Sequence, residues 1–73
     1  MSKEATFFIY LIERYAENKK TTAQKILKQW DSLGLTDFIY SMYEIYHIER
    51  LENAFDDIDR LILEKKDGCL GTV

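Results

Sequence analysis

The feature that most constrains the fold is the near absence of residues that break helices. The chain of 73 residues contains no proline, and Gly34 is the only one of its three glycines outside the C-terminal end. Inside a helix, proline and glycine cost about 3 and 1 kcal/mol relative to alanine. Apolar residues also recur at every third or fourth position, which is the period of one helix face. The sequence therefore predicts an all-α protein, a compact bundle of three to four short helices.

Four amphipathic segments follow from this period, over about 3–18, 22–33, 36–46 and 51–65. The stretch from His47 to Glu52 can be read either as a short break or as a continuation of the third segment. The side chains expected to face inward share the spacing of a helix stripe. They are Phe7, Phe8, Leu11, Ile12, Tyr15, Ala16, Ala23, Ile26, Leu27, Trp30, Leu33, Phe38, Ile39, Met42, Tyr43, Ile45, Tyr46, Leu51, Phe55, Ile58, Leu61 and Ile62.

The predicted ends of the segments carry capping signals. Thr21 and Gln24 have the spacing of a capping box at the start of the second segment. Gly34 is expected to end that segment in a left-handed conformation. Thr36 is expected to cap the third segment. The last segment is expected to end near Lys65, where a positive charge is favourable.

A chain of this length makes one domain with a thin core. Below about 80 residues a single core rarely supplies more than ~3–5 kcal/mol. The single cysteine, Cys69, excludes an internal disulfide, and one Cys with one His cannot complete a four-ligand zinc site. Tight helix packing or self-association, for example as a homodimer, is therefore expected. We expect one helical domain over 1–66 and a flexible C-terminal tail over 67–73.

The sequence gives no sign of export or membrane insertion. No apolar run approaches the ~18 residues of a membrane span. The apolar patch near the N-terminus follows Glu4, precedes Glu13 and Arg14, and lacks a small-residue cleavage site. With a lone cysteine, a cytoplasmic location is expected.

The charge distribution bears on nucleic-acid binding. The second and third segments with the Gly34 turn have the spacing of a helix-turn-helix, so a nucleic-acid-binding regulator is the alternative interpretation. Residues 36–63 carry two bases and seven acids, a net charge of −5, which would repel phosphate, so we expect no nucleic-acid partner. Residues 1–35 carry six bases and four acids, a net charge of +2. The two halves could pair head to tail, or the acidic half could meet a basic partner.

Two short patterns could suggest a metal site. Glu44 and His47 have the Glu-x-x-His spacing of carboxylate-bridged metal bundles, which need two such copies. The acids of Asp56-Asp57-Ile58-Asp59 do not alternate around a glycine turn, as those of a calcium loop do. The sequence also lacks a nucleophile beside a base and a glycine-rich phosphate loop. We therefore expect no catalytic residue, no metal and no cofactor, and hence no enzyme.

Five tyrosines are many for so thin a core to bury with every hydroxyl paired. Tyr40, Tyr43 and Tyr46 follow a three-residue step that turns around the third segment, so one or two of them should reach the surface. Exposed tyrosines are enriched at protein–protein interfaces. The residues expected to contact a partner protein are Tyr40, Glu44, Tyr46, His47 and Asp56.

Several short motifs lie between Phe7 and Ile62. They are Ile12-Glu13-Arg14-Tyr15-Ala16, Leu33-Gly34-Leu35, the run Phe38 to Tyr43, His47 and Asp57-Ile58. Together they resemble a family of small bacterial domains of unknown function. Members of that family are often encoded beside a larger protein that resembles ADP-ribosyl-transferring toxins. By association the resemblance implies a small partner or antitoxin-like subunit, and it agrees with a non-enzymatic protein-interaction module.

Overall fold

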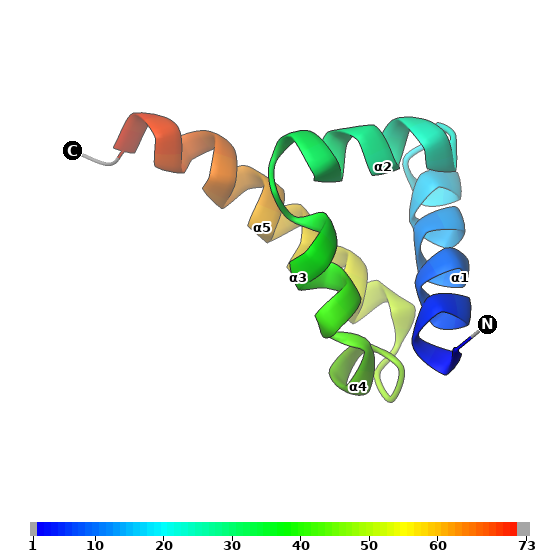
Figure 1. Ribbon diagram of the computed structural model, residues 1–73. Coiled ribbons are helices and arrows are strands. Elements are labelled where there is room, and N and C mark those ends of the chain that lie inside the picture. The colour runs from blue at the N-terminus through cyan, green and yellow to red at the C-terminus, as the bar shows by residue number, and fades with distance from the viewer. Residues whose placement is uncertain (1, 72–73) are drawn as a thin grey trace.

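Five α-helices make up this computed structural model, which describes the backbone of residues 2–71 and the side chains of residues 2–66. They are α1 (Lys3–Asn18), α2 (Ala23–Ser32), α3 (Thr36–Ser41), α4 (Tyr43–Tyr46) and α5 (Leu51–Gly71). Helix α2 crosses one end of α1. Helices α3 and α4 descend beside α1, and α5 runs behind α3 and extends past α2 (Figure 1). The prediction of an all-α, compact bundle is confirmed.

The first helix has the bounds that its sequence predicts. The Ser2 hydroxyl accepts a hydrogen bond from the Ala5 amide at 3.1 Å, which satisfies one of the free amides at the start of α1. The buried side chains of α1 repeat at one helical turn, so one stripe faces the core. They are Leu11, Ile12, Tyr15 and Ala16.

A Schellman motif ends α1, and it overturns the predicted capping box. Lys20 takes a left-handed φ of 59°, its amide donates to the Glu17 carbonyl, and the Thr21 amide donates to the Ala16 carbonyl at 2.9 Å. Thr21 therefore belongs to the end of α1. The cap of α2 is Thr22, whose hydroxyl accepts from the Lys25 amide at 3.3 Å.

The same motif ends α2, this time at the glycine that the sequence singles out. Gly34 has a φ of 70°, and the Leu35 amide donates to the Trp30 carbonyl at 2.8 Å. Leu35 folds back and is buried, as expected. The predicted cap at Thr36 is wrong: Leu35 occupies the cap position, and the Thr36 hydroxyl donates to the Asp31 carboxylate instead.

The third predicted segment is bent at Met42, where α3 ends and α4 begins. Ile39 and Tyr46, two helical turns apart, both enter the core, whereas Phe38 and Ile45, which were expected to face inward, are exposed. Residues 47–50 then form a break, so of the two interpretations the break is confirmed.

The last helix is longer than predicted. Helix α5 runs from Leu51 to Gly71, so Lys65 and Lys66 do not mark its C-terminal end. The predicted flexible tail over 67–73 stays a prediction, because the side chains of 67–71 and all of 72–73 lie outside the described residues.

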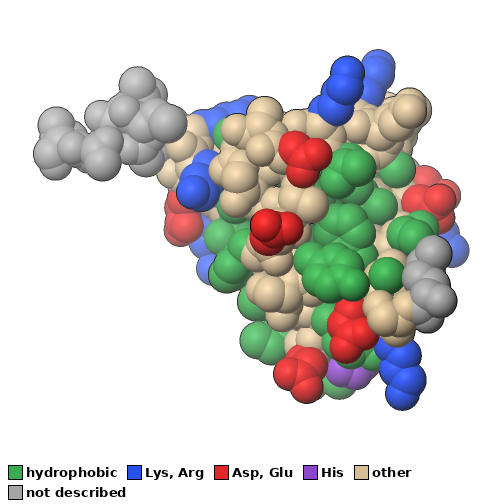
Figure 2. Space-filling model, in the orientation of Figure 1, with side chains coloured by type: hydrophobic (Ala, Val, Ile, Leu, Met, Phe, Trp, Pro, Cys, Tyr) green, Lys and Arg blue, Asp and Glu red, His purple; other side chains and the backbone are tan. Residues whose placement is uncertain are grey.

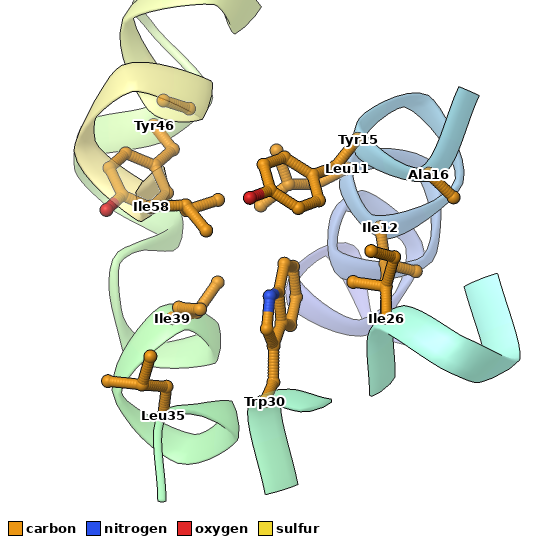
Figure 3. Close-up of a cluster of buried hydrophobic side chains, with 11 residues drawn as sticks. Leu11, Ile12, Tyr15, Ala16, Ile26, Trp30, Leu35, Ile39, Tyr46 and Ile58 are labelled. Carbon is orange, nitrogen blue, oxygen red and sulfur yellow. The ribbon is translucent and has the colours of Figure 1, made fainter. Parts of the chain in front are cut away.

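The core is built around Trp30. Its indole stands between side chains of α1 on one side and Leu35 and Ile39 on the other (Figure 3). The centroid of the indole lies 5.8 Å from that of Phe8, in a T-shaped arrangement, and 5.6 Å from that of Tyr15, in a tilted one. From α5 come Ile58, as predicted, and Ala54, whose small side chain gave no sign of burial in the sequence.

Replacing Lys20 with glycine is expected to stabilise the protein by about 0.5–1 kcal/mol. A left-handed residue with a Cβ is strained, and glycine relieves that strain at this position of a Schellman motif. Urea unfolding followed by circular dichroism measures the change. The matched control is Lys28→Gly inside α2, which should lose about 1 kcal/mol. Equal losses for the two variants would contradict this reading of Lys20.

Candidate functional site

Aromatic side chains gather on the surface that α1 shares with α3 and α4. We call this surface the aromatic face. It consists of Phe7, Phe8, Tyr10, Tyr40, Tyr43 and His47. Figure 2 shows hydrophobic side chains gathered where α1 faces α3.

One half of the aromatic face is a shallow groove centred on Phe7. The groove is lined by Lys3, Thr6, Phe7, Tyr10, Tyr43 and His47. The ring centroid of Phe7 lies 5.6 Å from that of Tyr43, 6.3 Å from that of Tyr10 and 6.4 Å from that of His47. The groove is therefore formed where the N-terminal half of α1 packs against α4, two segments that lie far apart in the sequence.

His47 is held in place although it is exposed. Its ring stacks on Tyr43 at 4.4 Å with an interplanar angle of 4°, as the four-residue spacing on one helix face allows. Its Nδ1 atom lies 2.7 Å from the Tyr43 carbonyl oxygen. That oxygen can only accept, so Nδ1 carries the proton in this bond and Nε2 is left for another partner.

Tyr10 forms one rim of the groove. Its side chain is 44% exposed, and the Arg14 guanidinium lies over its ring at 5.3 Å. This cation–π contact restricts the ring without covering it. Tyr10 therefore offers a restrained aromatic surface to the solvent.

The other half of the aromatic face is the Phe8–Tyr40 pair. The two ring centroids lie 5.4 Å apart, and the hydroxyl groups of Tyr40 and Ser2 lie 3.5 Å apart. Phe8 also touches Trp30, so this pair joins the surface to the core. Tyr40 is 39% exposed, in agreement with the prediction that some tyrosines reach the surface.

The five predicted contact residues do not form one site. Tyr40 and His47 lie on the aromatic face, and Glu44 is exposed on α4. Asp56 is exposed but lies on a different surface, which it shares with Ile45, Glu49, Asn53, Asp57 and Arg60. Tyr46 is 1% exposed, which confirms the prediction that it faces inward, so its ring is not on the surface where a contact residue would lie.

The sequence interpretation missed the part that α1 plays. Phe7 was assigned to the core, and Tyr10 was not placed in the site. A signal did exist in the three-residue spacing of Phe7 and Tyr10 and the four-residue spacing of Tyr43 and His47, which place each pair on one side of a helix. What joins the two pairs is the packing of α1 on α4, which local spacing cannot show.

Asp57 and Asp59 accept hydrogen bonds from buried tyrosines. The Tyr15 hydroxyl donates to Asp59 at 2.5 Å, and the Tyr46 hydroxyl donates to Asp57 at 3.0 Å. Lys19 also donates to Asp59, at 2.8 Å. Burial raises the pKa of both tyrosines well above the usual value, and the neighbouring carboxylates raise it further.

Asp57 also has a basic partner on its own helix, because Arg60 pairs with it at 3.0 Å. Asp57 and Asp59 flank Ile58, whose side chain enters the core. Their carboxylates therefore lie at the edge of the core, where they reach the tyrosine hydroxyls.

The arrangement bears on the metal and nucleic-acid readings of the sequence. Among residues 2–66, no three His, Cys, Asp or Glu side chains lie close enough together to hold a metal ion. Helix α3 would be the reading helix of a helix-turn-helix, but it has only six residues, and its one charged side chain is Asp37. An acid near the reading position would repel the phosphate backbone.

A family model described as "Protein of unknown function (DUF3791)" matches residues 6–65 of the chain. No curated protein and no solved structure matches this chain. Within the part of the chain that the structure describes, no helix is both long and apolar enough to cross a membrane.

Proposed function

The chain belongs to the DUF3791 family, a family of unknown function, and we propose that it acts as a small non-enzymatic protein-interaction module. The observation that carries the proposal is the aromatic face, where rings from α1, α3 and α4 meet and three of them stay exposed. These three are Tyr10, Tyr40 and His47. Aromatic side chains of this kind dominate the binding energy of protein interfaces.

The exposed rings are restrained before any partner binds. Arg14 lies over Tyr10, Tyr43 stacks on His47, and Phe8 packs against Tyr40. A restrained side chain loses less conformational entropy on binding than a free one, so more of its contact energy appears as affinity.

The finer form of the proposal comes from the family resemblance. In this form the module would act in the bacterial cytoplasm as the small, antitoxin-like subunit of a larger, toxin-like enzyme. In that role the aromatic face would cover an apolar patch of the enzyme. A homodimer through the same face is the other form of the proposal.

We expect a photo-crosslinking side chain at Tyr10, Tyr40 or His47 to capture the same partner in the native cell. The reason is that all three side chains are exposed and belong to the aromatic face. The measurement is mass spectrometry of the covalent adduct, with the mass in solution determined alongside. The control is the same crosslinker at Gln24, an exposed residue at the start of α2.

In a binding assay with the captured partner, Tyr10→Ala should weaken binding about tenfold or more, as the loss of an interface hot spot does. The variant should stay folded, because Tyr10 lies outside the buried core. The proposal fails if the three positions give no adduct of defined mass, or if Gln24 gives the same adduct.

A further inference from the structure

We propose that this protein has a second docking surface, a lysine-rimmed groove between α2 and α5 that takes an acidic amphipathic helix of a partner protein. The rim of this lysine groove is formed by Lys19, Lys25 and Lys66. Its apolar lining comes from Ile26, Ile62 and Leu63. The inference does not depend on the aromatic face.

The walls of the lysine groove are the diverging helices α2 and α5, and Tyr15 and Lys19 from the C-terminal end of α1 line it as well. Helix α5 continues past α2 toward its C-terminal end (Figure 1), so within the backbone of residues 2–71 no other helix closes the groove between them. Ile26 lies at the base and is buried, Ile62 is half-buried, and Leu63 is 59% exposed. An open apolar seam between two helices is the kind of surface that a third amphipathic helix fills.

The charges of the groove select the partner. It is lined by three lysines and one acid, Asp59. Asp59 already accepts hydrogen bonds from Lys19 and Tyr15. Within the described side chains, Lys25 and Lys66 form no ion pair. A helix that carries acids on both sides of an apolar stripe would meet the lysines with its flanks and the lining with its stripe.

Other occupants fit this groove less well. A membrane surface is flat and would not reach Ile26, which is 5% exposed between the walls. A second copy of this chain would have to supply its acidic helix α5, but the apolar stripe of that helix, including Ala54 and Ile58, is packed in its own core. A nucleic acid would leave the apolar lining unused.

The test is a selection of displayed helical peptides on the full chain. The library fixes apolar residues at helical spacing over 18 positions and varies the others among Glu, Lys, Gln and Ser. We expect the enriched peptides to be acidic. Their affinity should fall at least tenfold for Lys25→Glu and for Lys66→Glu, and should change less than twofold for Lys3→Glu, the same substitution in the groove of the aromatic face.

Leu63→Ser should also weaken these peptides, because Leu63 supplies exposed apolar surface to the groove. Circular dichroism checks that each variant stays folded, as expected for exposed positions.

The inference is wrong if no peptide is enriched, if the enriched peptides are neutral or basic, or if they bind the Lys→Glu variants as well as they bind the original chain. Peptides that lose affinity with Tyr10→Ala would belong to the aromatic face. Stronger binding to phosphatidylserine vesicles, to duplex DNA or to a second copy than to the best peptide would also overturn it.

Discussion

The Trp30→Ala variant is expected to be largely unfolded at room temperature. Trp30 is completely buried and packs against Phe8 and Tyr15. Truncation of a buried tryptophan to alanine costs about 3–5 kcal/mol, which equals the ~3–5 kcal/mol that a core of this size supplies. Far-UV circular dichroism and urea unfolding measure the loss of helix and of stability.

The control for this prediction is Trp30→Phe. The Trp30 Nε1 atom is buried and finds no hydrogen-bond partner among the described residues, so phenylalanine removes an unpaired donor together with part of the ring. We expect this variant to stay folded and to lose about 1–2 kcal/mol, the effect of a partly filled site. An alanine variant that unfolds at nearly the same urea concentration as the original chain would show that Trp30 is not the centre of the core.

Above pH ~10, the protein is expected to lose stability steeply, by about 3 kcal/mol at pH 11. The pKa of Tyr15 and of Tyr46 is raised in the folded state. The unfolded chain therefore releases these two protons at lower pH than the folded chain does. Their contribution is fully present below the unfolded pKa of ~10 and falls by about 1.4 kcal/mol per pH unit for each tyrosine above it. Urea unfolding at pH 8, 10 and 11 measures the slope.

The variants Tyr15→Phe and Tyr46→Phe test the origin of this slope. Each removes one titrating hydroxyl, so each single variant should keep about half of the slope, and the double variant should lose most of it. At neutral pH each should cost about 1 kcal/mol, because Asp59 or Asp57 loses the hydrogen bond from the tyrosine hydroxyl. An unchanged slope in the double variant would assign the alkaline loss to other groups.

The elements that the sequence predicts well are those with local causes. The bounds of α1 follow from a helical period that no breaker interrupts. The Schellman motif at Gly34 is predictable because a left-handed position favours glycine. The same motif at Lys20 was missed, since lysine rarely takes that conformation.

The bend at Met42 has no counterpart in the sequence. Neither glycine nor proline lies near it, so the period alone predicts one straight segment. Ile39 and Tyr46 are seven residues apart, or two helical turns, so they would share one side of a straight segment as well, and their burial depends on where α1 and α5 lie. The period predicts correctly that Tyr46 faces inward, and only the packed helices show that its ring is not left on the surface.

The hydrogen bonds of the buried tyrosines also could not be predicted from the sequence. Tyr15 and Asp59 are 44 positions apart, and the composition showed only that five tyrosines were many for this core. The aromatic face has the same origin, because it joins α1 to α3 and α4. Local spacing finds the residues on each helix, and only the packed helices show which of them meet.

The order of the helices in space has a consequence for how quickly the chain folds. Each helix from α1 to α5 packs against the next one along the chain, and the connections between them are short. Chains dominated by such local contacts reach the native state in microseconds to milliseconds. A nascent chain of this kind can therefore fold soon after it leaves the ribosome, before its hydrophobic side chains contact those of other molecules.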